Sequence, residues 1–229
     1  RAMIRLFFHH LKRALASLRI LYILVAMVLA ILLIVIDHPA SNLHFGEVMT
    51  LGSRNGVMMG GILLFVLSYL THEEDQCAII PMTKQRNRYA LSRLLALDVI
   101  VLLVNVIYTA LLAAIVPLSM NVVIAKTSFK VMMIIGLSYA FLEIMGVTLF
   151  VLLSSFMKAT IYRFDVLIVM SLMPVLLSYG RPYIKQPILT KLLYSQSLGI
   201  RLTNLVIALI ISVIITLIYG FLANRRAAC

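Results

Sequence analysis

Long apolar runs separated by short polar stretches divide this chain into six hydrophobic segments. The first of these runs reads LYILVAMVLAILLIVI at 21–36. An α-helix rises about 1.5 Å per residue, so a run of this length crosses a hydrocarbon layer about 30 Å thick. The pattern predicts an all-α polytopic integral membrane protein with a single transmembrane domain over 1–229. The six predicted transmembrane helices are about 19–36, 55–71, 93–118, 129–153, 164–179 and 202–222.

Residues 1–18 show a different pattern, with apolar and basic positions that alternate at the period of a helix. Apolar residues fall at 3, 4, 7, 8, 11, 14, 15 and 18, and polar residues at 1, 5, 9, 12 and 19. The period predicts an amphipathic helix that lies in the membrane interface and leads into the first span, with His9 and His10 on its interfacial face. A plain positively charged flank is the alternative.

The second predicted span opens with small residues. Gly56-Val57-Met58-Met59-Gly60 matches the small-xxx-small pattern, which predicts close packing against another helix.

Composition supports a membrane protein. The mean hydropathy is +1.08 and only 12% of residues are charged, against about 25% in soluble domains. The net charge of +12 comes from bases beside the predicted spans, where they set topology and contact anionic lipid headgroups. Membrane lipids are therefore expected partners, and nucleic acid is not.

The distribution of bases predicts the orientation. With the amino terminus in the cytoplasm, thirteen of the 20 Lys and Arg residues lie inside, and an even number of spans returns the carboxyl terminus to the same side. Between the last two spans, 180–201 is predicted to form an external or re-entrant element. Arg1-Ala2 and Ala227-Ala228-Cys229 are expected to be remnants of cloning.

The chain lacks the common catalytic and nucleotide-binding motifs. It has no GxxxxGK[ST], so it does not bind ATP through a P-loop, and it has no GxSxG. His72-Glu73 does not continue into HExxH, since position 76 is Gln. We therefore predict no catalytic, cofactor or metal site in this chain.

Polar residues inside the predicted spans are candidates for a functional site. A carboxylate in hydrocarbon is costly unless it is paired, protonated or faces water. Glu143 in the fourth span and Asn105 in the third are candidates for a translocation path. The alternatives for Glu143 are a hydrogen bond to a neighbouring span or a place at a subunit interface. Asp98 and Asp165 are expected to pair with Arg93 and Arg163, respectively.

The most concentrated charge lies in the predicted cytoplasmic connection THEEDQCAIIPMTKQRNRYALSRLL at 71–95. Acids come first, Pro81 follows, and a basic stretch then leads into the third span. Because Pro81 cannot continue a helix, 72–80 is predicted to form a short separate helix. The preference for bases in the cytoplasm explains the second half but not the acids. The alternative is a charged loop that only enforces orientation.

This order of residues resembles the coupling region of ABC-2 type transporter permeases. In that family an acidic residue after the second span is followed by a Leu/Ile-Pro-[apolar]-[Ser/Thr]-[Arg/Lys] element and then by a helix with Tyr or Val and a base. Here Glu73/Glu74, Ile80-Pro81-Met82-Thr83-Lys84, Tyr89 and Arg93 occupy those positions. The predicted interfacial helix, six spans and cytoplasmic termini are similar to the family's half-transporter plan.

The resemblance implies the permease subunit of an ATP-driven exporter in the bacterial cytoplasmic membrane. A second permease, identical or similar, would complete the dimer, and two cytoplasmic ABC ATPase subunits would bind ATP and Mg and dock at 72–92. The implied cargo is amphipathic or hydrophobic, such as peptides, toxins or antibiotics, as in the phenol-soluble modulin exporters. The residues implied in ATPase coupling are Glu73, Glu74, Asp75, Lys84, Arg86 and Arg88.

Two other functions remain open at this point. The first is a non-transporting assembly or sensor subunit, and the second is a proton-coupled secondary transporter that uses Glu143.

Overall fold

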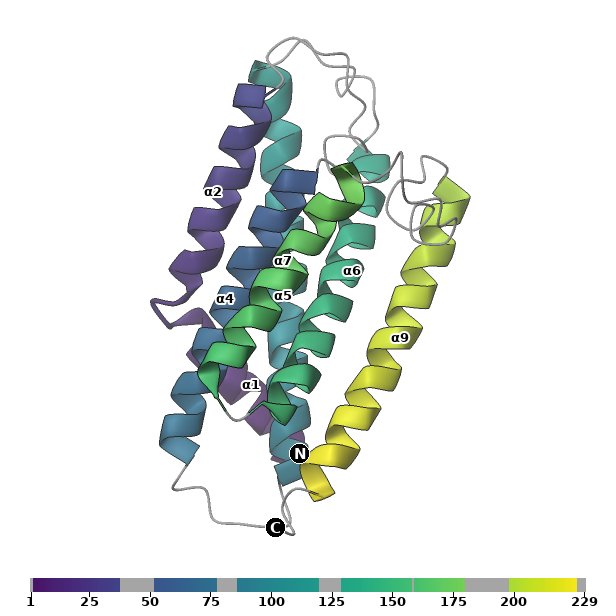
Figure 1. Cartoon of the computed structure of the whole chain (residues 1–229). Coiled ribbons are helices and arrows are strands. Elements are labelled where there is room, and N and C mark those ends of the chain that lie inside the picture. The colour runs from purple at the N-terminus through teal and green to yellow at the C-terminus, as the bar shows by residue number, and fades with distance from the viewer. Residues whose placement is uncertain are drawn as a thin grey trace.

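The structure is a computed structural model, and it describes residues 2–37, 52–77, 86–119, 129–157, 159–179 and 198–225. These residues form seven helices (Figure 1). The helices are α1 (Ala2–Leu15), α2 (Ile20–Asp37), α4 (Gly52–Cys77), α5 (Arg86–Ser119), α6 (Phe129–Phe156), α7 (Thr160–Tyr179) and α9 (Leu198–Arg225). Over the described residues, the all-α prediction is confirmed.

Two of these helices are long and apolar enough to cross a membrane, through Arg88–Ile115 of α5 and Met132–Phe156 of α6. A third span results if α1 and α2 are taken as one element, although their axes are bent by 59°. Gly56–His72 and Val206–Leu222 are apolar but shorter. The described part of the chain is therefore that of a helical membrane protein, with fewer clear spans than the six predicted.

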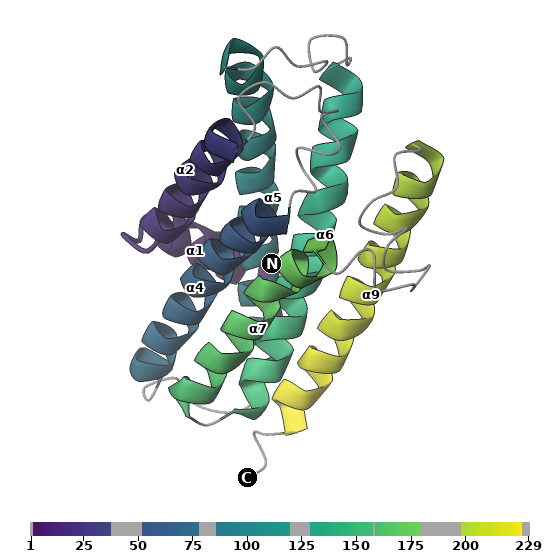
Figure 2. The ribbon, with the colours of Figure 1, turned by 45° about the horizontal axis from the view of Figure 1, so that its top comes forward.

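Each long helix packs against specific neighbours in the bundle. α4 contacts both α2 and α7, and α6 contacts both α5 and α9. Figures 1 and 2 show these long helices running side by side, while the short α1 lies at the lower end of the bundle in Figure 1, against α5. α4 ends and α5 begins at this same end, and α6 is joined there to α7. The described parts of the segments that the sequence predicts to be cytoplasmic therefore lie at one end of the molecule.

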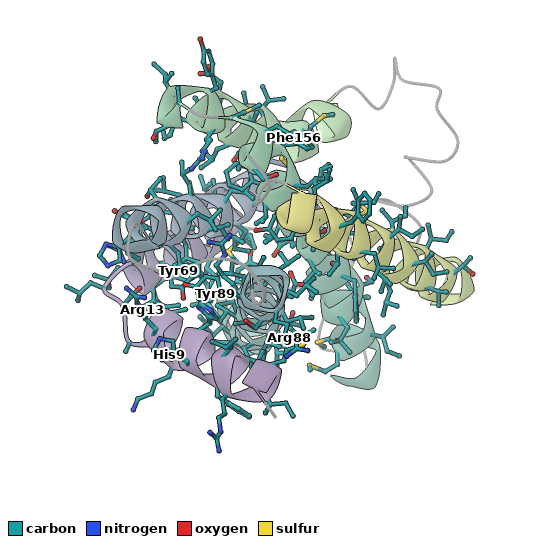
Figure 3. The ribbon with its side chains drawn as sticks, turned by 90° about the horizontal axis from the view of Figure 1, so that it is seen from below. His9, Arg13, Tyr69, Arg88, Tyr89 and Phe156 are labelled. Atoms are coloured by element: carbon teal, nitrogen blue, oxygen red, sulfur yellow. The ribbon has the colours of Figure 1, made fainter. Side chains whose placement is uncertain are left out.

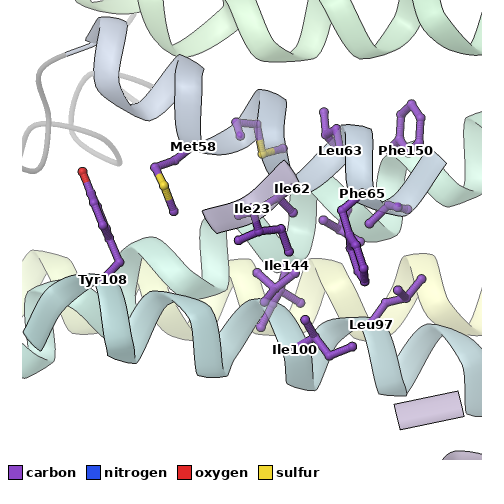
Figure 4. Packing of buried hydrophobic residues seen from close by; sticks show 14 of the residues in the cluster. Ile23, Met58, Ile62, Leu63, Phe65, Leu97, Ile100, Tyr108, Ile144 and Phe150 are labelled. Carbon is purple, nitrogen blue, oxygen red and sulfur yellow. The ribbon is translucent and has the colours of Figure 1, made fainter. Parts of the chain in front are cut away.

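The core forms where α2, α4, α5 and α6 meet (Figure 4). Ile23, Phe65, Leu97 and Phe150 are almost completely buried, each at 1% exposure or less. By contrast, the outer sides of α2, α7 and α9 expose many large apolar side chains. A soluble monomer rarely exposes apolar surface on this scale, whereas helices that face lipid do.

Small residues bring α4 close to its neighbours. A Cβ atom added at Gly60 would lie 3.3 Å from Ser171 Oγ of α7. One added at Gly61 would collide with Ala26 Cβ of α2 and lie 3.0 Å from the Tyr22 carbonyl oxygen. Close packing, predicted from Gly56 and Gly60, is tightest one residue beyond that motif, at Gly61.

The acidic half of the charged connection continues the helix of the second predicted span. α4 runs unbroken from Gly52 through Cys77, so 72–77 is not part of a separate short helix, and that prediction is wrong. No Gly or Pro lies between Gly61 and Cys77 to break the helix, and Thr71 Oγ1 donates to the Leu67 carbonyl at 3.0 Å within it. Pro81 lies outside the described residues.

Candidate functional site

A buried histidine joins three helices at the end of the bundle where α1 lies. His10 of α1 has no exposed surface. Its Nδ1 is 3.1 Å from the hydroxyl of Tyr69 on α4, within hydrogen-bond distance. Its ring also packs edge-on against that of Tyr89 on α5, with 4.6 Å between centroids. We call His10, Tyr69 and Tyr89 the His–Tyr cluster; Figure 3 views the molecule from this end.

The burial of His10 corrects the prediction that both histidines lie on an interfacial face. α1 presents three faces rather than two. One packs on the bundle through His10 and Ala14, a second exposes Ile4 and Phe8, and a third exposes basic residues such as Lys12. His9 is exposed, as predicted. His10 lies about 100° further around the helix axis, so its side chain is buried in the core.

The two tyrosines of the His–Tyr cluster flank residues 73–88, which hold the acids and most of the bases of the charged connection. Tyr69 is four residues before Glu73, and Tyr89 directly follows Arg88. α4 carries Glu73, Glu74 and Asp75 in its last turns, and α5 begins at Arg86. Of the predicted coupling residues, Arg88 is exposed and is visible at this end in Figure 3. The side chains of 73–75 and 86, and the whole of Lys84, lie outside the described part of the chain.

Two arginines have partners other than those the sequence predicts. Arg93 Nη2 donates to the hydroxyl of Tyr219 on α9, at 2.7 Å, and so links α5 to the last helix. Its predicted partner, Asp98, is five residues along the same helix and therefore about 140° away around the axis.

Arg163 donates from Nε and Nη2 to the carbonyl of Met157, at 3.1 and 2.9 Å. It thereby satisfies a carbonyl at the end of α6. Residues two apart lie on opposite sides of a helix, which does not favour the predicted pair of Arg163 with Asp165.

The two candidate path residues contact each other between α5 and α6. Asn105 Nδ2 donates to Glu143 Oε2 at 2.6 Å and to the Val101 carbonyl at 3.0 Å. Asn105 is only 2% exposed, whereas Glu143 is partly exposed. One turn further along α5, Thr109 Oγ1 donates to the Asn105 carbonyl at 2.7 Å. The hydrogen bond of Glu143 with a neighbouring span, one of the alternatives for this residue, is therefore present, although the sequence did not identify Asn105 as its partner.

Asp98 is a second carboxylate, on the same face of α5 as Asn105. It precedes Asn105 by seven residues, which is about two helical turns, so the two residues lie on the same side of α5. Its Oδ1 is buried and accepts no hydrogen bond from the residues that the structure describes. We call Asp98, Asn105 and Glu143 the carboxylate seam. Among the described residues, no group of three or more His, Cys, Asp or Glu side chains is arranged to hold a metal ion.

Comparisons of this chain with models of protein families, with curated proteins and with solved structures find no match. The resemblance of the charged connection to ABC-2 permeases therefore stays a prediction, based on the residues between His72 and Arg93.

Proposed function

We propose that this chain is the transmembrane permease subunit of an ATP-driven exporter of the ABC-2 type. It pairs with a second permease in the bacterial cytoplasmic membrane and exports amphipathic or hydrophobic cargo such as peptides, toxins or antibiotics. Two separate ABC ATPase subunits, which bind ATP and Mg, dock at 72–92. The observation that carries the proposal is the order of charge in that connection, with acids at the end of α4 and bases at the start of α5.

The helices around the charged connection favour a coupling role. The first turns of α5 contact His10 of α1, which lies within hydrogen-bond distance of Tyr69 on α4, and they contact α9 through the bond between Arg93 and Tyr219. A charged segment that only set topology would not require buried polar contacts to three other helices at its ends. Charge pairs with a partner protein also provide specificity, which suits the docking of a particular ATPase.

The faces of α1 support the proposed placement of the helix in the cytoplasmic membrane interface. Exposed apolar residues such as Ile4 and Phe8 lie beside exposed bases such as Arg5 and Lys12. An interfacial helix needs this arrangement, because one side enters the acyl chains while the other meets water and anionic headgroups. Both termini are cytoplasmic in this proposal, and six helices other than α1 cross the bilayer.

Charge reversal tests the coupling role. The chain is co-expressed with the ABC ATPase encoded beside its gene, and ATP hydrolysis by the purified complex in lipid nanodiscs is compared with that of a Glu73→Lys/Glu74→Lys variant. We expect the variant to lose ATPase binding or the dependence of hydrolysis on the permease, because two attractive charges become repulsive.

Asp165→Lys provides the matched control. Asp165 is an exposed acid near the start of α7, outside the connection, and its reversal should leave the complex unchanged. If no ATPase binds the wild-type chain, or if the double reversal leaves coupled hydrolysis intact, the proposed function is wrong.

The contact between Asn105 and Glu143 favours one alternative function, a proton-coupled secondary transporter. A carboxylate inside a span with an amide as its hydrogen-bond partner is the kind of group that carries protons in such transporters. Transport that responds neither to Glu143→Gln nor to an imposed pH gradient would exclude it.

A further inference from the structure

α1 carries exposed apolar side chains on one stripe of its surface. Ile4, Phe8 and Leu15 are between 46% and 60% exposed. At about 100° per residue, these three positions fall within about 40° around the helix axis. The face that packs on the bundle carries His10, which lies about 160° around the axis from Phe8. The three residues, which we call the apolar stripe of α1, are therefore separate from the face in the core.

Two exposed bases border the apolar stripe at Phe8. Arg5 precedes Phe8 by three residues and Lys12 follows it by four, so both are its neighbours on the helix surface. Around the axis they lie about 60° and 40° from Phe8, on the same side of the stripe. α1 contains three bases and no acid, so this charged border has one sign only.

An apolar stripe with a basic border matches the chemistry of a phospholipid surface. The acyl chains cover the apolar side chains, while the bases lie at the level of the headgroup phosphates. Bases attract lipids that carry a net negative charge, whereas the ammonium and phosphate charges of a zwitterionic headgroup cancel. An acidic soluble protein would match the bases but would not cover the stripe with hydrocarbon.

We propose that Arg5, Phe8 and Lys12 form a binding site for phospholipids of net negative charge, which α1 selects over zwitterionic phospholipids. The inference deepens the proposed function and rests on it for the placement of α1 at the cytoplasmic interface. It adds the class of lipid that the helix selects and the residues that recognise it. Selection of a lipid does not require the ATPase.

The test uses the purified full chain in nanodiscs, without ATPase. Because the chain has no Trp, Phe8→Trp introduces a single indole between the two bases. Bromine atoms on acyl chains quench an indole that they contact. Quenching is measured against the mole fraction of brominated phosphatidylglycerol and, separately, of brominated phosphatidylcholine, in a background of unbrominated phosphatidylcholine. The two curves give the association constant of the anionic lipid relative to the zwitterionic lipid.

We expect a relative association constant above about five for Phe8→Trp, since each base near an anionic surface contributes a factor of about five. Ile4→Trp, one turn away on the same stripe, provides a second reporter with Phe8 intact. Val169→Trp is the control reporter, at an exposed position of α7 on the other side of the bundle from α1 (Figure 3), and its constant should be near one.

Charge removal tests the two bases. Arg5→Gln/Lys12→Gln, combined with Phe8→Trp, should lower the relative association constant about fivefold or more, and 0.5 M salt should lower it in the same direction. Both substitutions are at exposed positions and keep a long polar side chain, so the fold is preserved. Lys185→Gln/Lys191→Gln removes the same charge between α7 and α9, and should leave the constant unchanged.

Equal association of the two lipids at both α1 reporters would overturn the inference and would indicate that the bases face an acidic segment of a protein. So would a preference that survives Arg5→Gln/Lys12→Gln, an equal preference at Val169→Trp, or an equal loss in Lys185→Gln/Lys191→Gln. A chain that couples to its ATPase but shows no lipid preference would retain the proposed function and lose only the inference. A chain that shows the preference but binds no ATPase would retain the lipid site and lose the proposed function.

Discussion

The neighbouring glycines of α4 should respond oppositely to the same substitution. Gly61→Ala places a methyl group against Ala26 Cβ and 3.0 Å from the Tyr22 carbonyl, so α2 must shift its backbone. Overpacking of this kind costs about 1–3 kcal/mol, and the better helix propensity of Ala returns at most about 1 kcal/mol. We expect Gly61→Ala to lower the free energy of unfolding by about 1–2 kcal/mol.

Gly60→Ala is the matched control on the same turn of the same helix. Its methyl group would lie 3.3 Å from Ser171 Oγ, a side-chain atom that can yield by a few tenths of an ångström. The gain in helix propensity then remains, and we expect a change between zero and about 1 kcal/mol in the stabilising direction.

The assay is the thermal midpoint of each variant in detergent micelles, read as loss of the monodisperse peak on size-exclusion chromatography. For a chain of 229 residues, 1 kcal/mol corresponds to a shift of about 2–4 °C. Gly61→Ala should therefore unfold about 2–8 °C below the wild type, with Gly60→Ala at or above it. Equal midpoints for the two variants would refute the close contact between α2 and α4.

The polar contacts at the α1 end lead to two further predictions in the same thermal assay. His10→Ala should cost about 2–4 kcal/mol, because it leaves a cavity between three helices and removes the contact of the imidazole with the Tyr69 hydroxyl. His9→Ala at the exposed neighbouring position should cost less than about 0.5 kcal/mol. Tyr219→Phe should lower the free energy of unfolding by about 1–2 kcal/mol, because the hydrogen bond from Arg93 is lost. Tyr162→Phe, on the exposed side of α7, should leave the stability unchanged. Similar thermal midpoints for the two variants of either pair would contradict the contacts described.

The positions of the helices were largely predictable, because runs of apolar residues determine which segments become helical in such a chain. Five of the six predicted spans fall within one observed helix each, the first begins one residue before α2, and the predicted amphipathic helix corresponds to α1. The prediction of a separate helix over 72–80 relied on Pro81 as its end and is wrong about where that helix begins. α4 instead includes Glu73 in its last turns, with no breaker before Cys77.

Side-chain partners were less predictable, since they depend on how the helices rotate against one another. The polarity of His10 suggests exposure, yet an imidazole can be buried when a tyrosine hydroxyl lies within hydrogen-bond distance. The predicted pair of Asp98 and Arg93 rests on closeness in sequence alone, whereas the 3.6-residue period places the two residues about 140° apart around α5. Asn105 and Glu143 are 38 residues apart, and no spacing rule in a single sequence brings them together.

The contacts of His10 can form only after both tyrosines have been synthesised. Tyr69 follows it by 59 residues, and Tyr89 by a further 20. At a synthesis rate of about 5–20 residues per second, Tyr89 leaves the ribosome roughly 4–16 s after His10. α1 is therefore made before α4 and α5 but docks late, and until α5 is made, the exposed apolar residues of α1 can hold it at the bilayer surface. A nascent chain arrested before Tyr89 would have α1 on the membrane with no site in which to bury its histidine.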